Sequence, residues 1–370
     1  APSSNADVYN TAVGFNAGAA VTTGTSNTLI GGLAGQAITT GTYNDALGRS
    51  SLYTNTTGAY NVAIGSSSLQ NNTTANDNTG VGYKALYANT TGAQNTALGA
   101  YSLDASTTGL DNTALGTYSL GANTTASYNT AVGRSALTSN TTGASNTAVG
   151  HKAGYSNTTA TEMTAVGIEA LYSNTTGNTN SALGRRALYS TTTGVNNAGF
   201  GARTLYTNTT GSYNVSIGMD SLYSNTTASN NTAVGNSALY ANTTGDVNTA
   251  VGQGALAANT TASDNTAVGR QALTANTTGA SNVALGNNAL TTNTTGSANV
   301  AIGRDALKAN TTAANNTAVG YQSQEATTTG ASNTSVGLHA LRLNTTGTLN
   351  TASGYRALQG NTTAGNNTAF

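Results

Sequence analysis

The sequence predicts an all-β fold, a β-solenoid (a parallel β-helix or β-roll) of about 22 rungs with a 17-residue repeat. One glycine recurs every 17 residues from Gly14 to Gly354, without insertion or deletion. The consensus unit, N-T-A-V-G-x-x-A-L-x-x-N-T-T-G-x-x, is rich in Asn, Gly and Thr, which are poor helix formers. It also lacks the i, i+3, i+4 apolar spacing of helices. A fixed period of this kind is typical of repeat arrays, in which each unit packs on its neighbours.

The opening Asn of the unit is repeat position 1. Residues 10–370 form one continuous solenoid in this interpretation, and residues 1–9 form an N-terminal tail or junction segment. N-T-A-V-G predicts a short strand, N-T-T-G predicts a turn, and each rung is one strand–turn–strand–turn circuit. We expect the aliphatic residues at positions 4 and 9 to form the core. Examples are Val132, Leu137, Val149, Val166 and Leu171.

Position 1 stacks asparagines from successive rungs into one column. Side-chain amides stacked in this way can form a ladder, in which each donor meets the acceptor one rung away. The alternative is that the amides bind a ligand. Representative members of the predicted structural ladder are Asn129, Asn146, Asn180, Asn214 and Asn231.

Position 5 is glycine in every repeat, as at Gly133, Gly150 and Gly167. We expect a corner there that requires positive φ or a close backbone approach. The glycine at position 15 is different, because alanine replaces it in several repeats, as at Ala160 and Ala228. A left-handed conformation is therefore not expected at position 15.

Position 10 carries tyrosine in six successive repeats, which predicts a stripe of stacked rings. Stacked rings stabilise a solenoid face or pack against another chain, and the alternative is adhesion to carbohydrate or to a surface. The six residues of the stripe are Tyr155, Tyr172, Tyr189, Tyr206, Tyr223 and Tyr240.

The N-T-T stretches are also sequons for N-glycosylation, as at Asn140, Asn208 and Asn293. Glycans on successive rungs, about 4.8 Å apart, would collide. We therefore expect partial occupancy at most, in a host that has the glycosylation machinery.

The composition supports no enzyme class and no cofactor. The 12 basic and 12 acidic residues balance, and nucleic-acid binding needs a basic footprint. The chain has no cysteine and only two histidines, His151 and His339, far apart in the sequence. No metal-ligand spacing, paired carboxylates for acid–base catalysis or phosphate loop stands out. No apolar run reaches the roughly 18 residues of a membrane span.

The unit resembles a known family. N-T-A-V-G-x-x-A-L is similar to the N-S-V-A-I-G-x-x-A repeats in the heads of trimeric autotransporter adhesins. The fuller unit resembles NTA[VIL]GxxAL repeats of bacterial surface and phage tail-fibre proteins. The resemblance implies a left-handed, often trimeric β-roll exposed outside the cell. It also implies that Thr130 and Val132 point inward, whereas Asn129, Ala131 and Gly133 point outward.

These observations favour a structural subunit of an extracellular or cell-surface filament, in which rods stack head to tail through uncapped ends. The partner is then the chain itself, with lateral bundling or a trimer as further possibilities. The alternative is a trimeric adhesin or phage tail-fibre shaft that binds a surface glycan or receptor. An ice-binding solenoid comes third, because the paired threonines lie in a turn rather than as T-x-T on a strand. The assembly ends are expected at Gly18, Val21, Gly35, Ile38 and Phe370.

Overall fold

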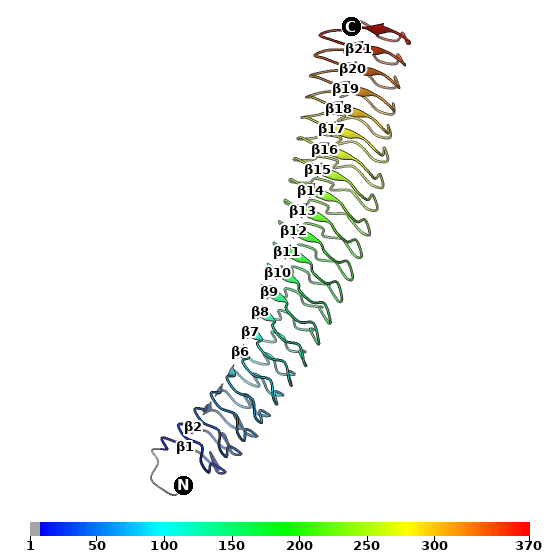
Figure 1. Ribbon diagram of the computed structural model, residues 1–370. Helices are drawn as coiled ribbons and strands as arrows, with labels where there is room; N and C mark the ends of the chain where they lie inside the picture. The colour runs from blue at the N-terminus through cyan, green and yellow to red at the C-terminus, as the bar shows by residue number, and fades with distance from the viewer. Residues whose placement is uncertain (1–7) are drawn as a thin grey trace. The chain divides into compact units, whose positions relative to one another are not determined.

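The computed structural model describes residues 8–370 and confirms the β-solenoid. Residues 1–7 of the predicted leading segment 1–9 lie outside the described residues. The chain divides into two units, Ala1–Arg185 and Arg186–Phe370. Each unit is a stack of parallel strands, one strand per rung, with consecutive strands lying one above the other (Figure 1).

Every strand is short and starts at position 2 of its repeat. The first unit contains β1 (Thr11–Val13), β2 (Thr28–Ile30), β3 (Asp45–Leu47), β4 (Val62–Ile64), β5 (Thr79–Val81), β6 (Thr96–Leu98), β7 (Thr113–Leu115), β8 (Thr130–Val132), β9 (Thr147–Val149), β10 (Thr164–Val166) and β11 (Ser181–Leu183). The second unit contains β12 (Ala198–Phe200), β13 (Val215–Ile217), β14 (Thr232–Val234), β15 (Thr249–Val251), β16 (Thr266–Val268), β17 (Val283–Leu285), β18 (Val300–Ile302), β19 (Thr317–Val319), β20 (Thr334–Val336), β21 (Thr351–Ser353) and β22 (Thr368–Ala369).

The strands pair in register, so each repeat position forms a column along its unit. Ala131 of β8 pairs with Ala148 of β9, and Ala165 of β10 pairs with the same Ala148 from the other side. Because the register never shifts within a unit, a residue type that recurs every 17 positions lies next to the same residue type in the neighbouring rung.

The second strand predicted in each rung does not form. Positions 6–11 make a series of turns instead, in which positions 7 and 9 have positive φ, as at Ser135 (58°) and Leu137 (50°). A non-glycine residue in this conformation costs about 1–2 kcal/mol. Burial of the leucine, worth about 1.5–3 kcal/mol, offsets that cost. The turn still bonds to the next rung, since the N–H of Leu137 donates to the carbonyl oxygen of Ala153 at 3.0 Å.

The predicted core is confirmed at position 9 and wrong at position 4. Leu137 and Leu171 are fully buried, as expected. Val132, Val149 and Val166 are not part of the core, because they are only partly buried and lie on the outer face of their strands. The resemblance therefore implied the wrong strand face: Thr130 also lies outside, whereas Ala131 and Asn129 are fully buried. In a strand, a shift of one residue moves every side chain to the opposite face.

The size of the rung interior explains why alanine faces inward. A typical cross-section already holds a leucine from position 9 and asparagines from positions 1 and 12, as at Leu137, Asn129 and Asn140, which are all fully buried. The remaining inward positions, 3 and 8, are filled by small residues such as Ala131 and Ala136. A valine would overpack an interior of this size.

The predicted corner at position 5 is confirmed. Gly133, Gly150 and Gly167 have φ of 128°, 138° and 132°. A Cβ on Gly133 would lie 2.6 Å from the carbonyl oxygen of Gly150 in the next rung. The positive φ therefore requires glycine there, and the close backbone approach adds to the cost of any side chain. At position 15, by contrast, Gly143 has no positive φ, as expected.

Candidate assembly surfaces

The predicted asparagine ladder at position 1 is confirmed and is entirely internal. The amide oxygen typically accepts from the backbone N–H one rung further on, and in most rungs the amide nitrogen donates to the position-15 carbonyl oxygen. Asn231 illustrates both bonds: its Oδ1 accepts from the N–H of Asn248 at 2.9 Å, and its Nδ2 donates to Gly245 O at 3.0 Å. Asn129, Asn146, Asn180, Asn214 and Asn231 are all fully buried. An external ligand therefore cannot reach these amides.

The asparagine of N-T-T, at position 12, forms a second buried ladder that the sequence interpretation missed. Nδ2 of Asn225 donates to Oδ1 of Asn208 at 2.9 Å and to Ala228 O at 3.0 Å. Asn140, Asn208 and Asn293 are all fully buried. The folded chain therefore cannot carry glycans at these sequons. The signal was present in the sequence, since position 12 recurs with the same period as position 1.

We expect the variant Asn231→Leu to lower the free energy of unfolding by about 2–4 kcal/mol. It leaves the N–H of Asn248 buried without its partner, and it removes one of the two side-chain donors to the Gly245 carbonyl, to which Asn242 still donates. Asn236→Leu, in the same rung but with its Nδ2 in an exposed bond to Met219 O, is the matched control, with an expected change below about 0.5 kcal/mol. Urea titration followed by circular dichroism measures both. Similar losses in the two variants would argue against a stabilising ladder.

The tyrosine stripe forms stacked columns within each unit. Tyr155 and Tyr172 stack in the first unit, with ring centroids 5.1 Å apart and planes 5° from parallel. In the second unit Tyr189, Tyr206, Tyr223 and Tyr240 stack in sequence at 5.1–5.2 Å. Stacked rings cover each other's faces and leave their edges to solvent. This geometry favours stabilisation of the column over sugar binding, which uses an open ring face.

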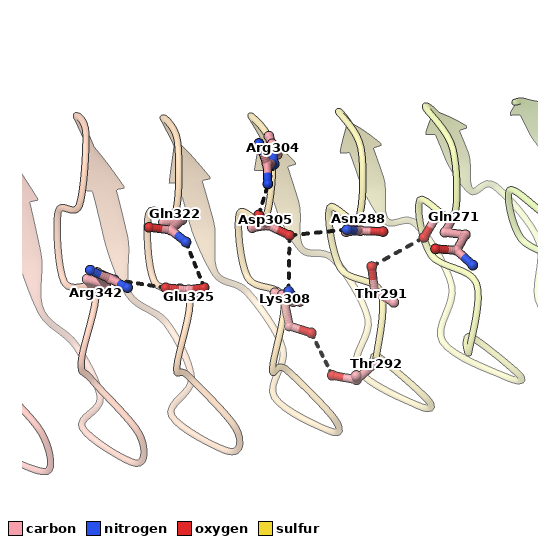
Figure 2. Close-up of polar contacts among 10 residues, drawn as sticks. All are labelled: Gln271, Asn288, Thr291, Thr292, Arg304, Asp305, Lys308, Gln322, Glu325 and Arg342. Carbon is pink, nitrogen blue, oxygen red and sulfur yellow. Dashed lines mark hydrogen bonds and ion pairs between the residues drawn. The ribbon is translucent and has the colours of Figure 1, made fainter.

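Several charged side chains at positions 6, 7 and 10 of later rungs form ion pairs. The carboxylate of Asp305, which is 5% exposed, contacts Nε of Arg304 and Nζ of Lys308, each at 3.2 Å. One rung further, Nε of Arg342 lies 2.8 Å from a carboxylate oxygen of Glu325 (Figure 2). In the first unit, burial raises the pKa of the Asp104 carboxyl, while a backbone hydrogen bond and Lys84 oppose that shift. The carboxylates of Asp305 and Glu325 therefore have cationic partners in their own rung or the next one.

In each unit the outer strand face carries two columns, mostly threonine at position 2 and mostly aliphatic at position 4. Its aliphatic side chains are substantially exposed, for example Leu98 (47%) and Leu183 (49%) in the first unit and Leu285 (46%) in the second. Between the columns of β2–β4 lies a shallow apolar cavity of about 240 Å³. Asp45 is the single charged residue in strands β1–β22. A neutral, flat, apolar face of this extent is typical of protein interfaces.

The first two rungs lack the buried leucine of position 9, a feature that they share with the later rung of Gly154. Gly18 and Gly35 stand where other repeats bury leucine, while Leu29 and Ile38, both fully buried, fill the space from other positions. A cavity of about 500 Å³ opens at the first rung, lined partly by Gly18, Val21 and Leu29. At the other end of the chain Phe370 is 94% exposed.

The chain matches no protein-family model and no curated protein. Among residues 8–370 no group of three His, Cys, Asp or Glu side chains could hold a metal ion. No helix in that range is long and apolar enough to cross a membrane.

Proposed function

We propose that this chain is a structural subunit of an extracellular or cell-surface filament, in which solenoids stack head to tail through open rung edges. The observation that carries the proposal is the complementarity of the strand edges of β1 and β22. Between described rungs the N–H at position 2 donates forward to the position-1 carbonyl, as Thr351 does to Asn367 at 2.8 Å. The N–H at position 5 donates backward to the position-4 carbonyl, as Gly354 does to Val336 at 2.8 Å.

Among residues 8–370 these bonds are not made at the outer edges of β1 and β22, and the two edges can supply them to each other. If β1 of one copy stacks on β22 of another, Thr368 N–H meets the Asn10 carbonyl, and Gly14 N–H meets the Phe370 carbonyl. The asparagine ladder also continues, because Asn10 N–H meets Oδ1 of Asn367, just as Asn367 N–H meets Oδ1 of Asn350 at 3.0 Å. An open strand edge is a template for pairing with a further chain, and here the second copy presents the matching edge.

Electron microscopy of the purified chain tests the proposal. We expect filaments with a layer line near 4.8 Å, the spacing of stacked strands. Removal of residues 1–40 should leave the remaining solenoid folded by circular dichroism, with the edge of β3 presenting the same backbone groups. Loss of the filaments in this variant would assign the junction to the side chains of the first rungs. Filaments that persist after this removal would contradict the proposed role of the first rungs.

A cysteine pair tests the register of the junction, since the chain has no cysteine of its own. Thr11 and Thr368, both exposed, occupy position 2 of β1 and β22. Stacked copies bring their Cα atoms to about 4.8 Å, within the range of a disulfide. The double variant Thr11→Cys, Thr368→Cys should therefore form disulfide-linked ladders on oxidation. The control Thr11→Cys, Thr363→Cys, whose cysteines lie in different columns, should not.

The exposed strand face favours a second candidate, a multi-chain shaft such as that of a trimeric adhesin or phage tail fibre, whose tip binds a surface glycan or receptor. Lateral packing of two copies would bury the position-4 column, and matching rung spacing lets the side chains interdigitate along each unit. Light scattering distinguishes the two candidates. Discrete particles of two or three chains, dispersed by Leu98→Lys with Leu285→Lys, would favour the shaft. Particles that grow end to end would favour the filament.

A further inference from the structure

We propose that the stacked tyrosine pairs are sites of oxidative cross-linking, in which a carbon–carbon bond joins the phenol rings of two successive rungs. The four rings of the second unit carry the argument. Tyr206 and Tyr223 lie with centroids 5.1 Å apart and planes 6° from parallel. Tyr189 and Tyr240 extend the stack at either end, each at 5.2 Å from its neighbour.

The rung architecture holds these phenols together before any reaction takes place. Tyr206 and Tyr223 follow the fully buried residues Leu205 and Leu222. The backbone of the column is bonded from rung to rung, since Thr207 N–H donates to the Tyr223 carbonyl at 3.1 Å. Two reacting groups that are held side by side react as one molecule, with a large gain in effective concentration over free collision.

The rings are also accessible to an oxidant, because their edges face solvent and Tyr240 is 40% exposed. A phenol that loses one electron and one proton becomes a phenoxyl radical, with spin density at the ring carbons ortho to oxygen. Two such radicals couple through one ortho carbon each. The hydrogens on those carbons then shift to the oxygens and restore both phenols.

The pair loses two hydrogen atoms in total, and the co-reactant that accepts them is hydrogen peroxide, which a haem peroxidase reduces to two water molecules. The product is a covalent staple between residues 17 apart in the sequence. The chain has no cysteine, so the stacked tyrosines give this solenoid a covalent link between rungs that disulfides cannot supply.

Peroxidase treatment of the purified chain, with peroxide in limiting amount, tests the proposal. We expect dityrosine fluorescence, a loss of two hydrogen masses per link, and linked peptides that pair Tyr206 with Tyr223 or Tyr223 with Tyr240. The yield should not change over a tenfold dilution, because the reaction is intramolecular. Tyr206→Phe with Tyr223→Phe should abolish the links among these three positions.

Tyr128 and Tyr213 provide an internal control for accessibility. They are 61% and 58% exposed, more than Tyr240, but their column neighbours are not aromatic: Asn196 and Asn230 flank Tyr213. Links that form mainly through Tyr128 or Tyr213 and decline on dilution would show that collision rather than stacking directs the coupling. That result, or the absence of any dityrosine, would overturn the proposal.

Discussion

Replacement of Ala131 with Asp should unfold the rungs around β8, whereas replacement of the next residue, Val132, with Asp should leave them folded. Ala131 is fully buried between Ala114 and Ala148 of the adjacent strands. A carboxylate there would be buried without a partner, at a cost of about 4 kcal/mol or more. Val132 lies on the outer strand face, where Asp45 is already accommodated in another rung. The expected loss for Val132→Asp is therefore about 1 kcal/mol or less.

Urea denaturation measures the two free energies of unfolding, and hydrogen exchange locates the affected rungs. The protected amides of β7–β9 should exchange quickly in Ala131→Asp and remain protected in Val132→Asp. The reverse order would mean that the strand faces the core with its position-4 side chains, as the family resemblance implied. Comparison of Ala131→Asp with Val132→Asp therefore shows which face of the strand points to the core.

Gly235→Ala should lower the free energy of unfolding by about 3 kcal/mol or more, because position 5 combines positive φ with a close backbone approach. Gly235 has φ of 133°, and a Cβ there would lie 2.6 Å from the Gly252 carbonyl oxygen. The matched control is Gly194→Ala at position 15. Its Cβ would be as crowded, 2.4 Å from Gly211 O, but its φ is not positive and Ala228 occupies the same position two rungs later.

The free energy of unfolding of Gly194→Ala should fall by less than about 1 kcal/mol, since the next rung can shift slightly to admit a methyl group. In Gly235→Ala the alanine would instead have to adopt the unfavourable positive φ of position 5. Thermal unfolding followed by circular dichroism measures both variants. Equal losses would show that crowding, and not backbone conformation, explains why glycine occupies position 5 in every repeat.

The sequence by itself determined the features that depend on the period. Glycine every 17 residues predicted the solenoid, and the recurrence of asparagine at position 1 predicted an amide ladder. The glycine at position 5 of every repeat predicted a corner such as Gly133. Tyrosine at position 10 of six consecutive repeats predicted stacked rings such as those of Tyr206 and Tyr223. These predictions succeed because stacking in register turns any recurrence along the chain into a column, whatever path the rung follows.

Only the tertiary structure decided what lies inside a rung. Successive residues of N-T-A-V-G point to opposite faces of the strand, and each face carries small or apolar side chains. The pattern therefore fits a strand that buries Val132 as well as one that buries Ala131. The choice depends on how much space remains after Leu137 and the two asparagine columns enter the cross-section, and that volume is set by the whole circuit. The same circuit buries Asn140, whose N-T-T context alone reads as an exposed turn. Local pattern determines the repeat and its columns, whereas closure of the rung determines which columns face the core.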